Sequence, residues 1–198
     1  RRRVQSVLAA HHVAGDAVNP LFETIDRLSD EVKKLEKVIA EMTKDDRAVQ
    51  LLMTIPGAGL ITAATIRAFT DDIRRYPTAG KYAAYAGLVP WVQNSNETIH
   101  HGRITRRGPV ELRTALVQVV LGMVRNRRRT GAYRILERYD RLKQAKGSGR
   151  SIIATARQLS EIIYRMLSDD LEFDESKMVD PAMRRKAMEM QATAWNVA

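Results

Sequence analysis

The amino-acid sequence predicts an all-α, mainly helical protein, in which a coiled-coil arm precedes a helical domain with one long loop or hairpin. Apolar residues recur at helical spacing in several runs, and glycines and prolines separate these runs. The sequence has no succession of short segments with alternating apolar residues, as an all-β fold would require. With 44% apolar and 28% charged residues, the 198-residue chain has a globular composition, which excludes wholesale disorder.

The coiled-coil arm is predicted by a heptad pattern. Apolar residues recur at alternating spacings of four and three, at Leu21, Ile25, Leu28, Val32, Leu35, Ile39 and Met42. Three heptads with apolar a and d positions are typical of a coiled coil, and Pro20 suits the start of a helix. We predict an arm over residues 15–46 that joins copies of the chain into a homo-oligomer; the alternative is a helix packed on its own domain.

After the arm, the sequence divides into helices and one less regular segment. Helices are predicted at residues 46–54, 60–69, 82–87, 109–128, 130–146 and 151–167, with a last amphipathic helix opening at Pro181. Residues 88–108 contain Pro90, Trp91 and two glycines among β-branched residues, which predicts a long loop or a hairpin. The domain boundaries that follow are a lead-in at 1–14, a helical domain at 47–168 and a C-terminal tail at 169–198.

Positive charge is concentrated in one segment of the chain. The whole chain has 33 Lys and Arg against 23 Asp and Glu, a net charge of +10. Residues 101–150 hold 14 basic and three acidic residues, so this segment carries +11 and the remainder −1. An Arg-rich segment favours nucleic-acid phosphates, which guanidinium groups bind in a bidentate manner. A solvated helix face and a membrane-surface helix are the alternatives. The helical residues that we predict to bind nucleic acid are Arg125, Arg127 and Arg128.

The sequence IPGAG at residues 55–59 matches a helix-hairpin-helix motif, in which an apolar-Gly-apolar-Gly turn joins two short helices. Gly57 and Gly59 permit backbone torsions that other residues resist. Amide N–H groups at the start of the second helix, together with its dipole, bind phosphate without regard to base sequence. We therefore predict that Gly57 and Gly59 contact nucleic acid; the alternative is a glycine turn between two core helices.

A second candidate site is a serine followed by a basic, glycine-containing segment. Ser95 lies in the polar sequence QNSN, and Gly102 and Gly108 bracket the basic segment. Such a segment can wrap a phosphodiester and neutralise charge on phosphorus, through Arg103, Arg106, Arg107 and Arg113. A serine needs a base or a cationic environment to act as a nucleophile. On these residues alone, a solvent-facing serine is the more common case.

Taken in order, these motifs resemble the C-terminal domain of the insertion-sequence-one-ten transposases, a family that includes the pilin-gene invertases. The motifs are IPGAG at 55–59, YAAYAGLVP at 82–90, Ser95, and GRITRRG at 102–108. The clear match covers residues 51–128, and the heptad arm resembles the family's coiled-coil linker. One departure is Asn96, because the family commonly has glycine after the serine, which predicts a somewhat different loop shape.

The resemblance implies a function in DNA recombination. Members of the family use a serine of this domain to attack a DNA phosphodiester, and Ser95 is the matching position. Their N-terminal half is a RuvC-like domain whose acidic residues hold Mg²⁺, and many members use a guide (bridge) RNA. We expect the chain to be a catalytic-serine and DNA-binding domain of a transposase or site-specific recombinase. The starting Arg1 and the lack of a metal-binding strand lead us to expect a fragment that is inactive alone.

The other polar and aromatic clusters are assigned structural roles. The two carboxylate clusters, at 71–72 and 169–175, are interpreted as a helix-end turn and a solvated loop, so no metal site is predicted in this chain. Tyr82, Tyr85 and Trp91 are candidates to stack on bases, but burial against helices is favoured. Cysteine is absent, which fits a reducing cytosol. The resemblance implies a cytoplasmic, nucleoid-associated protein of bacteria or archaea. No apolar run reaches the roughly 20 residues of a membrane span.

Two other functional classes stay open from the sequence. A non-enzymatic helix-hairpin-helix module would bind DNA or RNA by its backbone and form no covalent bond. An oligomerisation scaffold would depend on the arm, and its affinity for nucleic acid would hardly respond to salt, whereas phosphate-driven binding falls steeply with salt.

Overall fold

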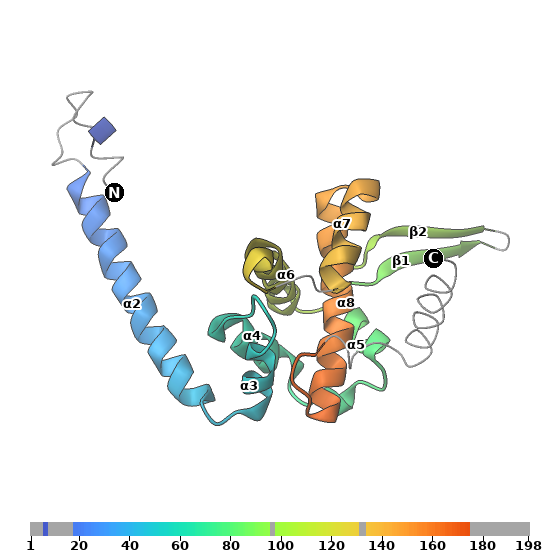
Figure 1. Cartoon of the computed structure of the whole chain (residues 1–198), viewed down its shortest axis with the longest axis horizontal. Coiled ribbons are helices and arrows are strands. Elements are labelled where there is room, and N and C mark those ends of the chain that lie inside the picture. Colours follow the sequence, from blue (N-terminus) through green and yellow to red (C-terminus); the bar gives the residue numbers. More distant parts are fainter. Residues whose placement is uncertain (1–5, 8–17, 96–97, 131–133, 175–198) are drawn as a thin grey trace, which may run out of the picture. The chain divides into compact units, whose positions relative to one another are not determined.

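The computed structural model describes residues 6–7, 18–95, 98–130 and 134–174, and it confirms a mainly helical chain (Figure 1). Two compact units meet at Lys44 and Asp45. The helices are α2 (Asn19–Thr43), α3 (Arg47–Met53), α4 (Leu60–Thr70), η2 (Ile73–Arg75, a 3₁₀ turn), α5 (Ala79–Tyr85), α6 (Val110–Thr130), α7 (Arg134–Lys146) and α8 (Ser148–Asp169). The strands β1 (Pro90–Ser95) and β2 (Thr98–Ile104) form an antiparallel hairpin.

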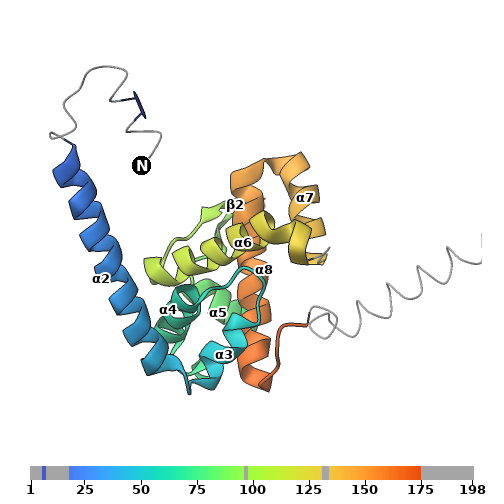
Figure 2. The ribbon, with the colours of Figure 1, turned by 60° about the vertical axis from the view of Figure 1, so that its left-hand side comes forward.

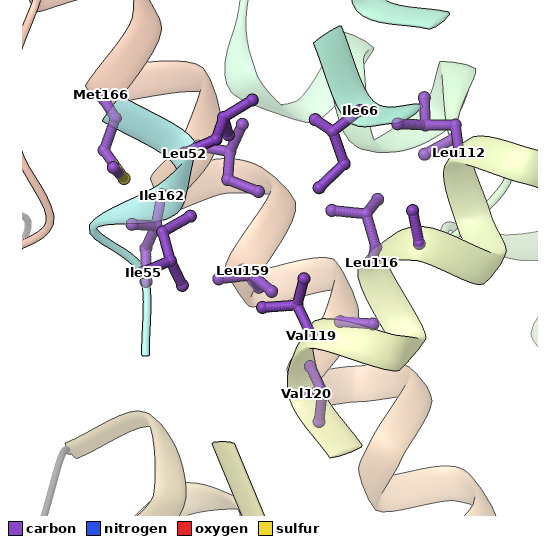
Figure 3. Close-up of a cluster of buried hydrophobic side chains, with 14 of the residues drawn as sticks. Leu52, Ile55, Ile66, Leu112, Leu116, Val119, Val120, Leu159, Ile162 and Met166 are labelled. Carbon is purple, nitrogen blue, oxygen red and sulfur yellow. The ribbon is translucent and has the colours of Figure 1, made fainter. Parts of the chain in front are cut away.

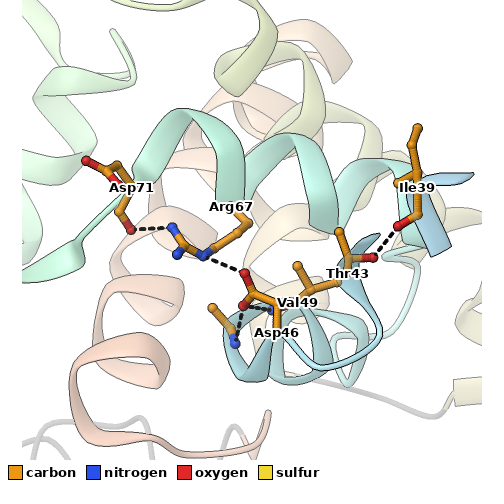
Figure 4. Close-up of polar contacts among 7 residues, drawn as sticks. Ile39, Thr43, Asp46, Val49, Arg67 and Asp71 are labelled. Atoms are coloured by element: carbon orange, nitrogen blue, oxygen red, sulfur yellow. Dashed lines mark hydrogen bonds and ion pairs between the residues drawn. The ribbon is translucent and has the colours of Figure 1, made fainter. Parts of the chain in front are cut away.

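The first unit contains the single long helix α2, as the heptad pattern predicts. Pro20 lies in its first turn, and near its end Thr43 Oγ1 donates to Ile39 O at 2.7 Å (Figure 4). No residue of α2 is buried in the described structure. The apolar positions of the heptad seam that are exposed are Leu21, Ile25, Leu28, Val32, Leu35 and Met42. The helix is confirmed; a coiled coil between copies stays a prediction.

The second unit is built around α8, against which α5, α6 and α7 pack (Figure 2). Helix α4 packs on α6, and the short helix α3 packs on both α4 and α8. The shared core contains Leu52 and Ile55 from α3 and the turn after it, Leu116 from α6, and Leu159 and Met166 from α8 (Figure 3). Burial of such aliphatic side chains supplies most of the driving force for folding. This core fixes the relative positions of the two candidate sites.

Asp46 joins the start of α3 to the end of α4 (Figure 4). Its Oδ1 accepts hydrogen bonds from the N–H groups of Ala48 at 2.9 Å and Val49 at 3.2 Å, which caps α3. Its Oδ2 accepts from Arg67 Nε at 2.9 Å, and Arg67 also donates to Asp71 O at 2.8 Å. Asp71 ends α4 with φ of 56°, so the helix-end turn predicted at 71–72 is confirmed.

The structure differs from the predictions at two helix starts and in one carboxylate stretch. Helix α5 starts at Ala79 rather than at residue 82, because Thr78 Oγ1 accepts from Lys81 N–H and caps it. Helix α8 starts at Ser148, so that of the predicted 147–149 break only Gly147, with φ of 80°, interrupts the helices. The carboxylate stretch from 169 is not wholly solvated, since Leu171 and Phe173 pack on the core. The lead-in at 1–14, apart from residues 6–7, and the predicted helix at Pro181 lie outside the described residues.

Candidate nucleic-acid interface

The IPGAG turn joins α3 to α4, and Gly57 is its tightest point. Gly57 has φ of 89°, a left-handed conformation that favours glycine. The turn is closed by a hydrogen bond from Ala58 N–H to Ile55 O at 3.0 Å. A Cβ at residue 57 would lie 2.6 Å from the carbonyl carbon of Gly122 in α6 and closer still to Met123 N. The predicted two helices and glycine turn are present, and Gly57 has a packing role in them.

Gly122 was not singled out by the sequence analysis, although it is the partner of Gly57. It lies inside α6, where glycine costs about 1 kcal/mol relative to alanine. A Cβ at residue 122 would lie 2.5 Å from Gly57 O, so only glycine allows the backbones of the turn and the helix to touch. A glycine in a long helical run was the signal in the sequence, but its partner lies 65 residues away and could not be read from local pattern.

The start of α4 lies beside the C-terminal half of α6 because of this contact. Gly59, the N-cap of α4, is exposed, and its N–H donates to Thr62 Oγ1 at 2.9 Å. Arg125 is exposed and follows Gly122 by three residues, which places it about one turn along the same side of α6. The structure thus brings Gly57 against Gly122, one helical turn before Arg125; contact of Gly57, Gly59 and Arg125 with nucleic acid stays a prediction.

Residues 88–108 form the hairpin that was one of the two predicted alternatives. Ser95 is the last residue of β1 and pairs with Thr98, next to the turn. The register changes near the base of the hairpin: Pro90 pairs with Ile104, but Val92 pairs with His101. One residue of β1, Trp91, therefore faces two residues of β2, as in a β-bulge. The backbone of Ser95 is placed by this register; its side chain, like that of Arg103, lies outside the description.

The basic loop, residues 105–108, folds back on the end of α5 and fixes the base of the hairpin. Thr105 N–H donates to Val89 O at 2.9 Å, and Arg106 N–H donates to Gly87 O at 3.2 Å. Gly87 and Gly108 have φ of 69° and 108°, and a Cβ on either would strike the backbone of the opposing segment. One close backbone approach therefore explains both Gly87 and Gly108.

Arg113 holds the basic loop in place from the first turn of α6. Its Nη1 donates to Arg106 O at 3.3 Å and lies 3.5 Å from Ala86 O. Arg106 itself has φ of 53°, a conformation that costs a residue with a side chain about 1–2 kcal/mol. The side chains of Arg106 and Arg107 are exposed, and neither forms an ion pair within the described ranges. The loop thus presents two guanidinium groups to solvent on a fixed backbone.

The predicted arginines form two groups rather than one. Arg106, Arg107 and Arg113 lie at the start of α6, and Arg125 and Arg127 lie near its end. Helical rise separates Arg113 from Arg125 by about 18 Å along the axis.

The arginines near the end of α6 also differ from one another. Arg127 Nη2 donates to both carboxylate oxygens of Asp140 at 3.0 Å, so it ties α6 to α7, whereas Arg125 is exposed. The side chain of Arg128 lies outside the description. Among the C-terminal residues of α6 that are described, Arg125 is the better placed for an external phosphate.

The three aromatic candidates for base stacking have different environments. Tyr82 is fully buried, its hydroxyl lies 2.7 Å from Thr70 Oγ1, and burial raises the pKa of its phenol. Tyr85 is half-buried and packs on the ring of Tyr76. Burial is therefore confirmed for Tyr82, but it is wrong for Trp91, which is 49% exposed on the hairpin. Trp91 lies on a hairpin that extends away from the helices. The sequence left a loop and a hairpin both open, so it did not predict this exposure.

Several carboxylates of the described residues form ion pairs or cap helices. Arg47 pairs with Asp170 at 2.9 Å, and Asp46 pairs with Arg67 at 2.9 Å. No group of three or more His, Asp or Glu side chains with the geometry of a metal site occurs in the part of the chain that the structure describes. Within the same part, no helix has the length and apolar character needed to cross a membrane.

Comparison with known proteins shows which family this part of the chain is similar to. A model described as the transposase IS116/IS110/IS902 family matches residues 49–134, which include the glycine turn, the hairpin and α6. A probable family 20 transposase of Pseudomonas aeruginosa is 30% identical over 111 residues, covering 56% of this chain and 33% of that protein.

Two further relatives match more of this chain. An uncharacterized 43.6 kDa protein of insertion element IS110 from Streptomyces coelicolor is 28% identical over 165 residues, which cover 82% of this chain and 39% of the relative. A pilin gene-inverting protein of Moraxella bovis is 27% identical over 165 residues, which cover 81% and 48%. The chain thus spans about a third to a half of the length of these relatives. The resemblance predicted from the sequence is confirmed: residues 49–134 match the model of the transposase IS116/IS110/IS902 family.

Proposed function

We propose that this chain is the DNA-binding and nucleophile-bearing part of a transposase or site-specific recombinase, and that Ser95 attacks a DNA phosphodiester. The observation that carries the proposal is the arrangement of the hairpin. Ser95 lies at the end of β1, and the exposed guanidinium groups of Arg106 and Arg107 lie on a fixed loop at its base. Two of the named relatives are a probable transposase and a pilin gene-inverting protein, which supports the same class of reaction.

The proposed step exchanges one phosphodiester bond for another. The Ser95 hydroxyl oxygen bonds to phosphorus and loses its proton to a general base, while the bond to one deoxyribose oxygen breaks. That oxygen leaves as a hydroxyl group after it takes up a proton, and the serine keeps the phosphate as a phosphodiester. Cationic side chains near the phosphate stabilise the charge that develops on its oxygens. The basic loop lies at the opposite end of the hairpin from Ser95, so in this proposal its arginines hold a neighbouring stretch of the DNA backbone and not the phosphate under attack.

Metal chemistry and guidance by RNA are proposed to come from outside residues 1–198. The resemblance implies a RuvC-like domain that holds Mg²⁺. Within the described residues, Asp46 caps α3 and pairs with Arg67, and Asp170 pairs with Arg47. A guide RNA is a further partner that the resemblance implies. We propose that the complete recombinase acts in the cytoplasm on chromosomal DNA, and that this chain contributes the serine and part of the DNA contact.

Removing the exposed charges of the basic loop is expected to weaken DNA binding and its salt dependence. Each phosphate contact that is lost lowers the slope of log affinity against log salt by about 1. Arg106→Gln combined with Arg107→Gln is therefore expected to lower the slope by about 2. Fluorescence anisotropy of a labelled DNA, titrated at several salt concentrations, measures this. The matched control is Lys33→Gln with Lys34→Gln, which removes two adjacent cations from α2, where each is paired to a carboxylate.

The control separates specific contact from general charge. Equal loss of slope in both double variants would show that the basic loop makes no contact of its own with the DNA backbone. A DNA affinity that does not change with salt concentration would contradict phosphate-driven binding and favour the oligomerisation scaffold.

We also propose that α2 assembles copies of the chain through its exposed apolar seam. Leu28 and Leu35 lie one heptad apart at successive equivalent positions and are 57% and 62% exposed. Isolated helices are marginally stable in water, and a partner helix buries such a seam. Leu28→Lys with Leu35→Lys is expected to convert the oligomer to a monomer, measured by light scattering after gel filtration.

The control for the arm keeps the helix but spares the seam. Asp30→Lys with Glu41→Lys changes exposed positions on the side of α2 away from the seam, so the oligomer is expected to persist. If the chain that has both leucines is itself monomeric at micromolar concentration, the arm does not join copies of this chain.

A further inference from the structure

Trp91 is an exposed aromatic residue at a place in the hairpin where the strand register changes. The indole is 49% exposed, although tryptophan normally buries a large apolar area in a folded protein. It stands opposite Gly102 and Arg103, the two residues that form the bulge in β2. Bulges re-aim side chains and are frequent beside functional sites. The exposed Trp91 therefore lies at a β-bulge, which sets the direction of its side chain.

Gly102 leaves space for the indole ring of Trp91, and its own backbone conformation does not require glycine. It is not among the glycines with positive φ, so another residue would fit its torsions. A Cβ at residue 102, however, would lie 3.0 Å from Cε3 of Trp91 and 3.7 Å from its Cβ. The missing side chain leaves room for the ring to lie on the β2 backbone. One part of the indole thus rests against Gly102, and the remainder faces solvent.

The position of Trp91 along the hairpin relates it to both parts of the proposed site. Pro90, its neighbour, pairs with Ile104, and the basic loop begins at the next residue. At about 3.3 Å per residue, the backbone of Ser95 lies about 13 Å from that of Trp91 along β1, and the basic loop lies in the opposite direction, beyond the base of the hairpin. Phosphate-binding groups, an aromatic surface and the candidate nucleophile therefore follow one another along the same ribbon.

We propose that Trp91 stacks on an unpaired nucleobase next to the phosphate held by the basic loop. Aromatic side chains beside cationic groups are the general means by which proteins bind single strands, because every base offers a flat π surface. A base inside an intact duplex is covered by its neighbours, so Trp91 selects unpaired or distorted nucleic acid. This inference rests on the proposed function, since it requires that the chain bind nucleic acid.

The test uses the fluorescence of Trp91 itself. The chain has two tryptophans, and Trp195→Phe leaves Trp91 as the only one. Titration with single-stranded DNA is expected to quench this emission, and an intact duplex of the same sequence is expected to change it little. An RNA strand of the same sequence is a third arm, which distinguishes a base in DNA from a base in a guide RNA. Unchanged emission with all three would overturn the proposal.

Substitutions at position 91 separate stacking from support of the hairpin. Trp91→Phe keeps a ring and is expected to lower single-strand affinity less than threefold. Trp91→Leu keeps apolar cover over Gly102 without a π surface, and it is expected to lower the affinity about 10-fold, as truncation of one stacked aromatic does. If Trp91→Leu binds as tightly as the parent, Trp91 only packs against Gly102 and the proposal is wrong.

The salt dependence distinguishes failure of this inference from failure of the proposed function. Trp91 contacts no phosphate in the proposal, so Trp91→Leu is expected to weaken binding while the salt slope stays that of the parent. A parent chain that binds DNA with a steep slope but shows no effect of Trp91→Leu keeps the proposed function and loses this inference. A parent chain that binds no nucleic acid loses both.

Discussion

Ser95→Ala is expected to abolish formation of a covalent protein–DNA adduct and to lower strand exchange about 10³-fold or more. The expected size follows from the loss of a nucleophile, because the remaining groups can bind the phosphate but cannot form the bond. The measurement is denaturing gel electrophoresis of an end-labelled, nicked DNA incubated with the complete recombinase, including the metal-binding domain that we place outside residues 1–198. Strand exchange is followed in parallel on a plasmid substrate.

Thr98→Ala is the matched control for Ser95. Thr98 is the strand partner of Ser95 and also carries a hydroxyl group, so its loss tests whether any hydroxyl near the tip suffices. We expect the adduct to persist in Thr98→Ala. Strand exchange that survives in Ser95→Ala would show that the nucleophile is another group. A parent protein that binds DNA yet never forms an adduct would favour the non-enzymatic binding module.

Gly122→Ala is expected to lower the free energy of unfolding by about 2 kcal/mol and the Tm by about 5 °C or more. Alanine is favoured over glycine in a helix by about 1 kcal/mol, so local propensity alone predicts the opposite sign. The new Cβ, however, would lie 2.5 Å from Gly57 O, and overpacking of this kind costs about 1–3 kcal/mol and sometimes more. Backbone is the obstacle here, and backbone cannot move aside as a flexible side chain can. Thermal unfolding followed by circular dichroism measures the change.

Gly59→Ala provides the comparison within the same turn. A Cβ at residue 59 would meet nothing within 4 Å, and the φ of −107° suits alanine. We expect a change in Tm of no more than about 2 °C, because only the N-cap preference changes. A Gly122→Ala protein as stable as the parent would mean that the turn and α6 do not touch through their backbones.

Local features of the fold could be predicted from the sequence because their causes are local. The seam of α2 depends on spacing within one helix, and the turn at Gly57 depends on a residue type that allows a left-handed torsion. The hairpin was predicted only as one of two alternatives, since the pairing of Pro90 with Ile104 depends on contacts between residues 14 positions apart. The start of α5 was missed because Thr78 caps it from a segment that has no apolar period.

The candidate site was predicted in composition more than in arrangement. The sequence places all the arginines in one basic segment, but a helix that continues from Arg113 to Arg125 separates them by its own length. Which arginines are engaged internally depends on distant partners: Asp140 for Arg127, and the carbonyl oxygens of Ala86 and Arg106 for Arg113. Only the folded chain distinguishes these from Arg106, Arg107 and Arg125.

The contact between Gly57 and Gly122 also has a consequence for the shape of any bound nucleic acid. Because backbone meets backbone there, no rotamer change alters the spacing between the first turn of α4 and the last turns of α6. A nucleic-acid strand that contacted both elements would have to match a fixed distance between them. The nucleic acid would then supply the deformation energy needed to match that distance. Sequences that bend readily would therefore bind better than stiff ones, without any contact to a base edge.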